Sequence, residues 1–207
     1  MPVHVVQHPV VQDALLSLRE ARTPPHEFRR AAARITTALV TEATRDVPCT
    51  HDTVETPLGP ADGHRIDGDI VVVPVLRAGL GMLDSVLALL PSARVGHLGL
   101  QRDETTAIAS QYYARLPSGL ERSYVLMIDP MLATGGSAVA ALEVLRRAGA
   151  TNVRLVCFVA APEGVECVLH RSPALAIYTA AVDKALNARQ FIVPGLGDFG
   201  DRLYGTT

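Results

Sequence analysis

One run of residues in the second half of the chain combines a carboxylate, two hydroxyl side chains and two adjacent glycines. It consists of Asp129, Pro130, Met131, Leu132, Ala133, Thr134, Gly135, Gly136 and Ser137. Adjacent glycines let the backbone turn tightly, so that several N–H groups face inward toward an anion, and the hydroxyl groups add further donors. A carboxylate repels phosphate but accepts hydrogen bonds from sugar hydroxyls. The run therefore predicts a cradle for a sugar phosphate.

The sequence on either side places this run between a strand and a helix. Residues 124–128 are continuously apolar, which is typical of a buried strand, and residues 137–148 have helical periodicity up to Gly149. A turn from strand to helix would add the positive end of the helix to the cradle. Taken alone, the run has a plainer interpretation, an ordinary glycine-rich turn, and that alternative stays open at this point.

Two other phosphate-binding patterns do not fit. A P-loop needs a lysine directly after its last glycine, but no lysine follows Gly136, and Lys184 is the only lysine of the chain. A GxGxxG match occurs at residues 195–200. A dinucleotide fingerprint must open the helix of a βαβ unit, and too little of the sequence follows this match to form one. We therefore expect the match to be coincidental.

The surrounding elements indicate how the run is positioned. Apolar runs at residues 70–76, 94–100, 124–128, 153–160 and 174–180 alternate with helix-length segments at residues 80–90, 137–148 and 163–170. This alternation predicts an α/β domain with a mainly parallel central sheet flanked by helices. Ligands of such sheets bind beyond the carboxyl ends of the strands, where Arg77 and Asp129 both fall.

The remaining segments complete one domain over residues 1–207, with its core at residues 70–190. Residues 9–46 are expected to form N-terminal helices, because apolar side chains recur at three- and four-residue steps. Residues 47–69 are rich in turn residues and predict a short β excursion. Residues 101–123 are polar and aromatic, and we expect them to form a mobile, β-rich lid over the ligand.

Composition narrows the class of protein. The chain is 48% hydrophobic, carries a formal net charge of −2 and has three cysteines without CxxC spacing. These values argue against a nucleic-acid partner held by bulk charge, a disulfide framework or a structural zinc site. The most apolar stretch contains Arg77 and Asp84, which makes it a poor membrane span. We expect a cytoplasmic protein with neither a nucleic-acid nor a membrane partner.

The sequence around the cradle resembles a known family. Residues 128–137 are similar to the phosphoribosyl-pyrophosphate (PRPP) loop of type I phosphoribosyltransferases, and proline at position 130, where most members have a second acid, is typical of uracil phosphoribosyltransferases. Residues 73–82, 159–164 and 194–202 resemble further signatures of that family, in the same order. The resemblance covers essentially the whole chain, so it is more specific than any single motif.

The resemblance implies roles for the residues that would bind PRPP. Residues 129–137 would hold the ribose and the 5′-phosphate, and Arg77 and Arg102 would contact pyrophosphate and phosphate oxygens. Magnesium would be held mainly by the substrate's oxygens and by water, with no direct ligand from the chain. Arg102 and Asp198 are the candidates for a direct part in catalysis.

The resemblance also implies a uracil site in the C-terminal segment 191–202. Ile192, Gly197, Asp198 and Phe199 would lie at the uracil edge, mostly through main-chain groups, with Asp198 also near the sugar phosphate and its magnesium. Uracil shows an acceptor–donor–acceptor edge, which a glycine-rich backbone can match. Cytosine carries a donor in place of one acceptor and would leave polar groups unpaired.

The implied reaction transfers the phosphoribosyl group of PRPP to N1 of uracil and releases UMP and pyrophosphate, as in pyrimidine salvage. The implied assembly is a homodimer or a higher homo-oligomer. Some family members respond to GTP, and the sequence does not reveal whether this chain does. Three alternatives remain: an RNA-binding regulator with this fold, a catalytically idle homologue, and an enzyme for another six-membered base. The last is prompted by Phe199, since the family usually has alanine there.

Overall fold

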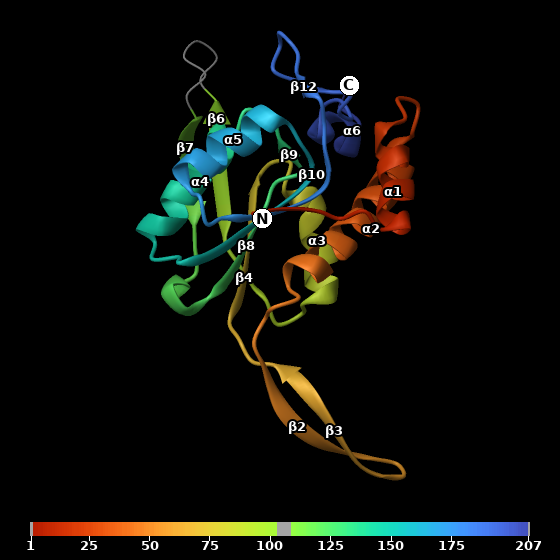
Figure 1. The fold of residues 1–207 in the computed structure, drawn as a ribbon, viewed down its shortest axis with the longest axis vertical. Coiled ribbons are helices and arrows are strands. Elements are labelled where there is room, and N and C mark those ends of the chain that lie inside the picture. The colour runs from red at the N-terminus through yellow and green to blue at the C-terminus, as the bar shows by residue number, and fades with distance from the viewer. Residues whose placement is uncertain (1, 103–108, 207) are drawn as a thin grey trace.

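The computed structural model describes residues 2–102 and 109–206 and contains a central sheet with helices on both faces (Figure 1). The strands lie in the order β1 (Val3–Val5), β11 (Ala176–Val182), β10 (Asn152–Ala160), β8 (Tyr124–Ile128), β4 (Ile70–Leu76), β6 (His97–Arg102) and β7 (Ala109–Arg115). Two short strands pair beside this path, β5 (Arg94–Val95) with β4 and β9 (Met131–Leu132) with β10. Neighbours from β1 to β6 are parallel, and β7 is antiparallel to β6. The predicted α/β class is confirmed.

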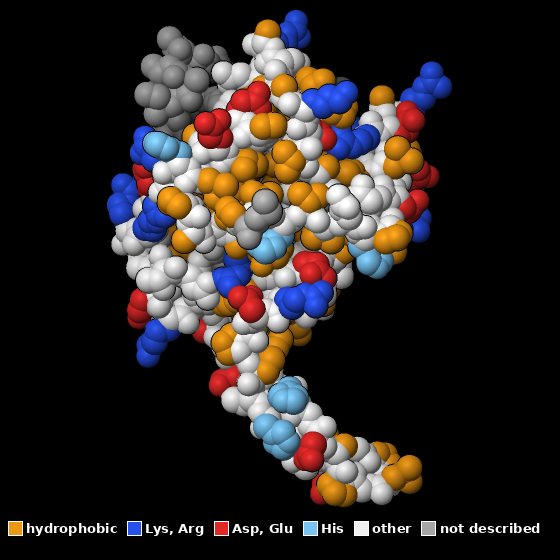
Figure 2. Space-filling model, viewed as in Figure 1, with side chains coloured by type: hydrophobic (Ala, Val, Ile, Leu, Met, Phe, Trp, Pro, Cys, Tyr) orange, Lys and Arg blue, Asp and Glu red, His pale blue; other side chains and the backbone are white. Residues whose placement is uncertain are grey.

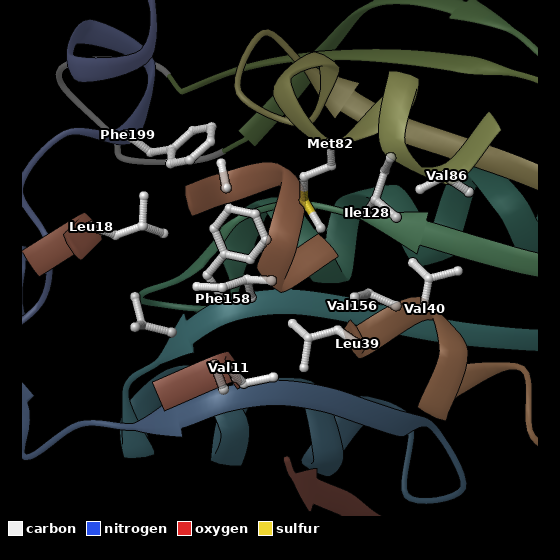
Figure 3. Packing of buried hydrophobic residues seen from close by; sticks show 14 of the residues in the cluster. Val11, Leu18, Leu39, Val40, Met82, Val86, Ile128, Val156, Phe158 and Phe199 are labelled. Carbon is white, nitrogen blue, oxygen red and sulfur yellow. The ribbon is translucent and has the colours of Figure 1, made fainter. Parts of the chain in front are cut away.

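Alternation along the buried strands divides the core into two layers. On one face, Val72, Leu126 and Phe158 pack with helices α1 (Pro9–Arg19), α2 (Pro25–Ala43) and α3 (Leu80–Leu89), as Figure 3 shows for part of this layer. On the other face, residues of the same strands pack with α4 (Gly136–Arg147) and α5 (Pro162–Arg171). Strands buried on both faces must be apolar at every position, which explains their continuous apolar runs.

The predicted N-terminal helices form and cover the sheet. The stripe of Phe28, Ala32, Ile35, Leu39 and Ala43 on α2 is fully buried, so its interpretation as a packing face is confirmed. No helix in the described ranges has the length and apolar character to cross a membrane.

Residues 49–66 form a long hairpin that projects from the body (Figures 1 and 2). Its strands are β2 (Cys49–Thr56) and β3 (Gly59–Ile66), which pair antiparallel along their whole length. Most of its side chains are exposed, and Leu58 at the turn is 99% exposed. The predicted β excursion is therefore confirmed and is longer than the turn-rich sequence suggested.

Other elements differ from expectation in detail. The expected strand at 94–100 is interrupted at Gly96, whose N–H is bound by the Val72 carbonyl, and it resumes through Arg102. In the expected lid at 101–123, residues 109–115 pair with β6 as the sheet strand β7, and Leu120–Arg122 is a short 3₁₀ helix. Residues 103–108 of that segment lie outside the described residues, and the mobility of the lid stays a prediction. The edge strand β1 and a C-terminal helix α6 (Phe199–Tyr204) were not expected.

Candidate active site

The loop from β8 to α4 lines a hollow at the carboxyl edge of the sheet. The hollow has a volume of about 260 Å³. It is lined by Asp129, Met131, Leu132, Ala133, Thr134, Gly135, Ser137 and Ala138. The predicted cradle residues other than Pro130 and Gly136 therefore line one space, and the space is large enough for a phosphate and part of a sugar.

The N-terminus of α4 opens onto this loop without a side-chain cap. Its N-cap residue, Gly135, lies in the left-handed region with φ of 82°, and no side chain accepts a hydrogen bond there. The first N–H groups of a helix have no partner within the helix, and they carry the positive end of its dipole. An uncapped N-terminus after a left-handed glycine is suited to binding an anion.

Helix α5 packs directly behind the loop. A Cβ atom added at Gly164 would lie 2.3 Å from the carbonyl oxygen of Ala133, and one added at Gly135 would lie 2.8 Å from the carbonyl oxygen of Gly164. Each glycine therefore permits the close approach of the other segment. Residues 159–164, which resemble a further signature of the family, line no part of the hollow. This contact gives them a role in the site, because they support the β8–α4 loop from behind.

Asp129 occupies the position expected for a ribose-binding carboxylate. It follows β8 directly, and its Oδ1 accepts a hydrogen bond of 3.4 Å from the N–H of Met131. Burial raises the pKa of Asp129 to about 7, and the Met131 hydrogen bond only partly opposes this effect. The surroundings of this carboxyl therefore favour its protonated form more than those of an ordinary surface aspartate do.

Arg77 stands on the neighbouring loop, between β4 and α3. The sheet register pairs Pro74 with Ile128, so Arg77 and Asp129 both emerge at the same edge. The Arg77 side chain is exposed, and none of the described carboxylates forms an ion pair with it. Among the described residues no carboxylate therefore occupies this guanidinium, whose planar donor fork suits an anionic ligand.

Two glycines join this loop to the other parts of the site. A Cβ atom at Gly79 would lie 2.5 Å from the carbonyl oxygen of Ile128, next to Asp129, and one at Gly81 would lie 2.4 Å from Cδ2 of Leu203 and 3.0 Å from Cε1 of Phe199. Hence the Arg77 loop, the β8–α4 loop and the C-terminal segment meet at the start of α3. The side chain of Arg102, at the end of β6, lies outside the described part of the structure.

The C-terminal segment forms a small unit of its own. Ile192, which is buried, pairs with Leu186 where β13 (Ile192–Val193) runs antiparallel to β12 (Ala185–Leu186). Gly195 and Gly197 follow with φ of 59° and 78°. This geometry places the GxGxxG match outside the main sheet, so its interpretation as coincidental is supported.

Asp198 and Phe199, both predicted to lie at the uracil edge, also have structural roles in this segment. Oδ1 of exposed Asp198 accepts a 2.9 Å hydrogen bond from the Asp201 N–H and thereby caps α6. Phe199 is only 2% exposed, and its ring packs against Phe28 and Phe158 with centroids 5.4 Å away in each case. Figure 3 shows the ring directed into the core. The expectation that Phe199 lies at the base can therefore hold only for its main chain.

Three charged residues bind the main chain of this segment and hold it in place. None of them was predicted from the sequence as a site residue. Arg19 at the end of α1 pairs with Asp183, and both bind Gly195. Nη1 of Arg202 donates to the carbonyl of Leu196 at 2.6 Å. The one available signal was Asp183 itself, an acid directly after a buried strand at the ligand-binding edge. The partners of Arg19 are too distant in sequence to be paired by pattern.

Comparison of the chain with known sequences gives full-length matches. A family model described as uracil phosphoribosyltransferase matches residues 5–206. A uracil phosphoribosyltransferase from Dictyoglomus turgidum is 48% identical over 205 residues, which are 99% of either chain. Another, from Halalkalibacterium halodurans, is 49% identical over 205 residues, covering 99% of this chain and 98% of its own.

Comparison with solved structures gives a close and a distant match. The AQ2163 protein from Aquifex aeolicus superposes with a TM-score of 0.93 at 35% identity over 99% of both chains. An adenine phosphoribosyl transferase from Trypanosoma brucei has a TM-score of 0.61 at 12% identity, covering 92% of this chain and 87% of its own. The second likeness concerns the fold alone.

Proposed function

The chain belongs to the uracil phosphoribosyltransferase family and transfers the phosphoribosyl group of PRPP to N1 of uracil, giving UMP and pyrophosphate; we propose that the three segments meeting at the start of α3 form its active site. The observation that supports this most directly is the hollow beside Asp129, which ends at the uncapped N-terminus of α4. It offers phosphate donors and a sugar acceptor side by side.

On the donor side, we assign the 5′-phosphate to the main-chain N–H groups at the start of α4 and to the hydroxyls of Thr134 and Ser137. Asp129 accepts hydrogen bonds from the ribose hydroxyls and so fixes the orientation of the anomeric carbon. Because its pKa is about 7 in the unliganded chain, hydroxyl donors that stabilise the charged form would lower it on binding. Arg77, and Arg102 from the adjoining β6, bind the pyrophosphate.

The donor set fits a magnesium ion that comes with the substrate. Asp129 and Asp198 are separate carboxylates, and the described residues contain no cluster of three acidic, histidine or cysteine side chains. Magnesium commonly keeps several waters and binds substrate phosphates with one or two carboxylates at most. When bound, the ion would neutralise charge on the pyrophosphate. We therefore propose that PRPP and water supply most of its ligands.

On the acceptor side, uracil is read by main-chain groups of residues 192–199. No described residue hydrogen-bonds the N–H or the carbonyl of Gly197, so both are available to a ligand. Phe199 turns its ring into the core and leaves only its backbone at the pocket. Chemical specificity then comes from the backbone pattern, as the uracil edge requires.

The transfer forms the bond between uracil N1 and the anomeric carbon, while the bond from that carbon to pyrophosphate breaks and N1 loses its proton. The chain contributes mainly by holding the two reactants in line and by stabilising the departing charge. Asp198 uses Oδ1 to cap α6, which leaves Oδ2 without a partner among the described residues. We keep Asp198 as the candidate proton acceptor. Of the described residues in the expected lid at 101–123, only the end of β6 and the start of β7 lie at the carboxyl edge of the sheet, and we propose that this part excludes water.

We also propose that the chain works as a homodimer. The β2–β3 hairpin exposes Val54, Leu58 and Ile66, which are 44%, 99% and 53% exposed, and it packs along little of its length against the body. A two-stranded hairpin is marginal on its own. We therefore infer that the exposed apolar side chains of the hairpin pack against a second copy of the chain.

The direct test incubates the protein with PRPP, magnesium and one base at a time, and measures nucleotide and pyrophosphate. We expect UMP from uracil and little product from cytosine or purines. The variant Arg77→Gln should raise the KM for PRPP much more than that for uracil. Faster conversion of another base, or no UMP at any substrate concentration, would contradict the proposal.

A further inference from the structure

The C-terminal segment is held at Gly195 by two charged side chains that lie outside the PRPP and uracil residues assigned above. Asp183 follows β11, and its side chain is 5% exposed. Its Oδ2 accepts a 2.9 Å hydrogen bond from the N–H of Gly195. Arg19 donates from Nη1 to the carbonyl of Gly195 at 2.8 Å and to Oδ2 of Asp183 at 2.9 Å, and from Nη2 to Oδ1 at 2.6 Å.

These hydrogen bonds hold both the N–H and the carbonyl of Gly195 in place. Gly195 has φ of 59°, and a Cβ atom there would lie 2.2 Å from the carbonyl oxygen of Ile192. The backbone is therefore folded tightly on itself in a conformation that favours glycine. The following carbonyl, of Leu196, is bound by Arg202. The main chain is thus held in place up to Gly197, whose own N–H and carbonyl have no partner among the described residues.

We propose that Arg19 and Asp183 are positioning residues for uracil, acting through the main chain of residues 195–197. The inference rests on the proposed uracil site in this segment. A base read by backbone groups is recognised only if those groups keep their spacing and direction, because displacement of a reacting partner by about 1 Å can cost about 100-fold in rate. Arg19 and Asp183 supply that rigidity from α1 and β11, which belong to the core rather than to the loop.

Both the charge of the Asp183 carboxylate and the two donor nitrogens of the Arg19 guanidinium are needed to hold Gly195. A buried carboxylate is tolerated only when it is paired and hydrogen-bonded. All the groups that bind the carboxyl of Asp183 are donors, so an asparagine would turn its own N–H₂ toward one of them. A lysine at position 19 would keep the charge pair but could not bridge both oxygens of Asp183 and the Gly195 carbonyl.

The test compares steady-state kinetics of Asp183→Asn and Arg19→Lys with the wild-type chain. For Asp183→Asn we expect the KM for uracil to rise about 10-fold or more, with a smaller rise for Arg19→Lys, while the KM for PRPP stays within about two-fold. Preference for uracil over cytosine should fall in the same order. Loss of rigidity without a role in uracil binding would instead affect both substrates.

Asp69→Asn is the matched control, since Asp69 also pairs with an arginine, accepting a 2.7 Å hydrogen bond from Nε of Arg94, but lies at the opposite edge of the sheet. The inference is overturned if Asp183→Asn raises the KM for uracil no more than this control does, or raises both KM values equally. If Asp183→Asn does not fold, Arg19→Lys decides by the same criteria. A wild-type chain that makes no UMP would overturn the proposed function as well, whereas an active wild type with unaffected variants overturns this inference alone.

Discussion

Replacing Asp129 with asparagine is expected to stabilise the folded chain at alkaline pH while it impairs PRPP binding. The Asp129 carboxyl is half-buried at the end of β8 beside the hollow, and removal from water raises its pKa from 3.8 to about 7. The folded chain therefore binds this proton more tightly than the unfolded chain. Stability from this group is present below pH 4 and is lost as the pH rises through 7, because the charged form is the one that burial disfavours.

The size of the effect follows from the two pKa values. Their difference corresponds to about 4 kcal/mol, and partial contact of the carboxyl with water in the hollow lowers this to about 2–4 kcal/mol. Asparagine has nearly the same shape and can still accept the Met131 hydrogen bond, but it carries no charge. The free energy of unfolding of Asp129→Asn should therefore exceed that of the wild type at pH 8, and the difference should shrink to below about 1 kcal/mol at pH 4.

Urea unfolding of both chains at several pH values between 4 and 8 measures this difference. Asp84→Asn serves as the control, because Asp84 is an exposed carboxylate on α3 without an ion pair among the described residues. In parallel, the KM for PRPP of Asp129→Asn should rise at least about 10-fold, since the ribose hydroxyls lose a charged acceptor and one of the two carboxylate oxygens is replaced by an N–H₂ donor. A difference in stability that does not change with pH would refute the argument from burial.

Three further changes have separate expected results. Gly135→Ala should lower the free energy of unfolding by about 1–3 kcal/mol because of its left-handed φ and the contact with Gly164. Gly136→Ala should cost less, because a Cβ atom there would meet only Oγ1 of Thr134, at the ordinary contact distance of 3.8 Å; thermal unfolding distinguishes the two variants. Phe199→Ala should cost about 3–5 kcal/mol in denaturant unfolding by leaving a cavity, yet the preference for uracil over other bases should persist, and a changed preference would show that the ring reaches the pocket. Replacing residues 50–65 by a short Gly-Ser turn should leave a folded monomer by circular dichroism and sedimentation; a dimer of unchanged affinity would exclude the hairpin from the interface.

The elements of the fold could be predicted where one local pattern determines them. Strands β4, β8 and β10 are buried on both faces, so their continuous apolar runs identify them. The cradle was predictable for the same reason, because its glycines, hydroxyls and carboxylate are adjacent in sequence. The edge strand β1 has only Val3–Val5 and pairs on one side, and α6 has six residues. Segments this short carry too few residues to show a period.

The fastening of the C-terminal segment could not be predicted, because its contacts join residues far apart in the sequence. Arg19 and Asp183 are 164 residues apart, and Arg19 and Gly195 are 176 apart. Each residue alone is an ordinary surface charge or turn glycine by type. Their pairing depends on α1 ending beside the carboxyl end of β11, which follows from packing of the helix layer rather than from any local pattern.

The inward direction of the Phe199 ring has a consequence for evolution within the family. When a pocket is built from main-chain groups, the side chains that accompany those groups are released from selection by the substrate and remain subject only to selection for stability. A small residue and a large aromatic one can then succeed each other at the same position, provided that a neighbour such as Gly81 makes room. In the proposed site, substitutions of side chains beside the base therefore change the packing of the core. A shift in substrate preference should instead be sought at the glycines that shape the backbone.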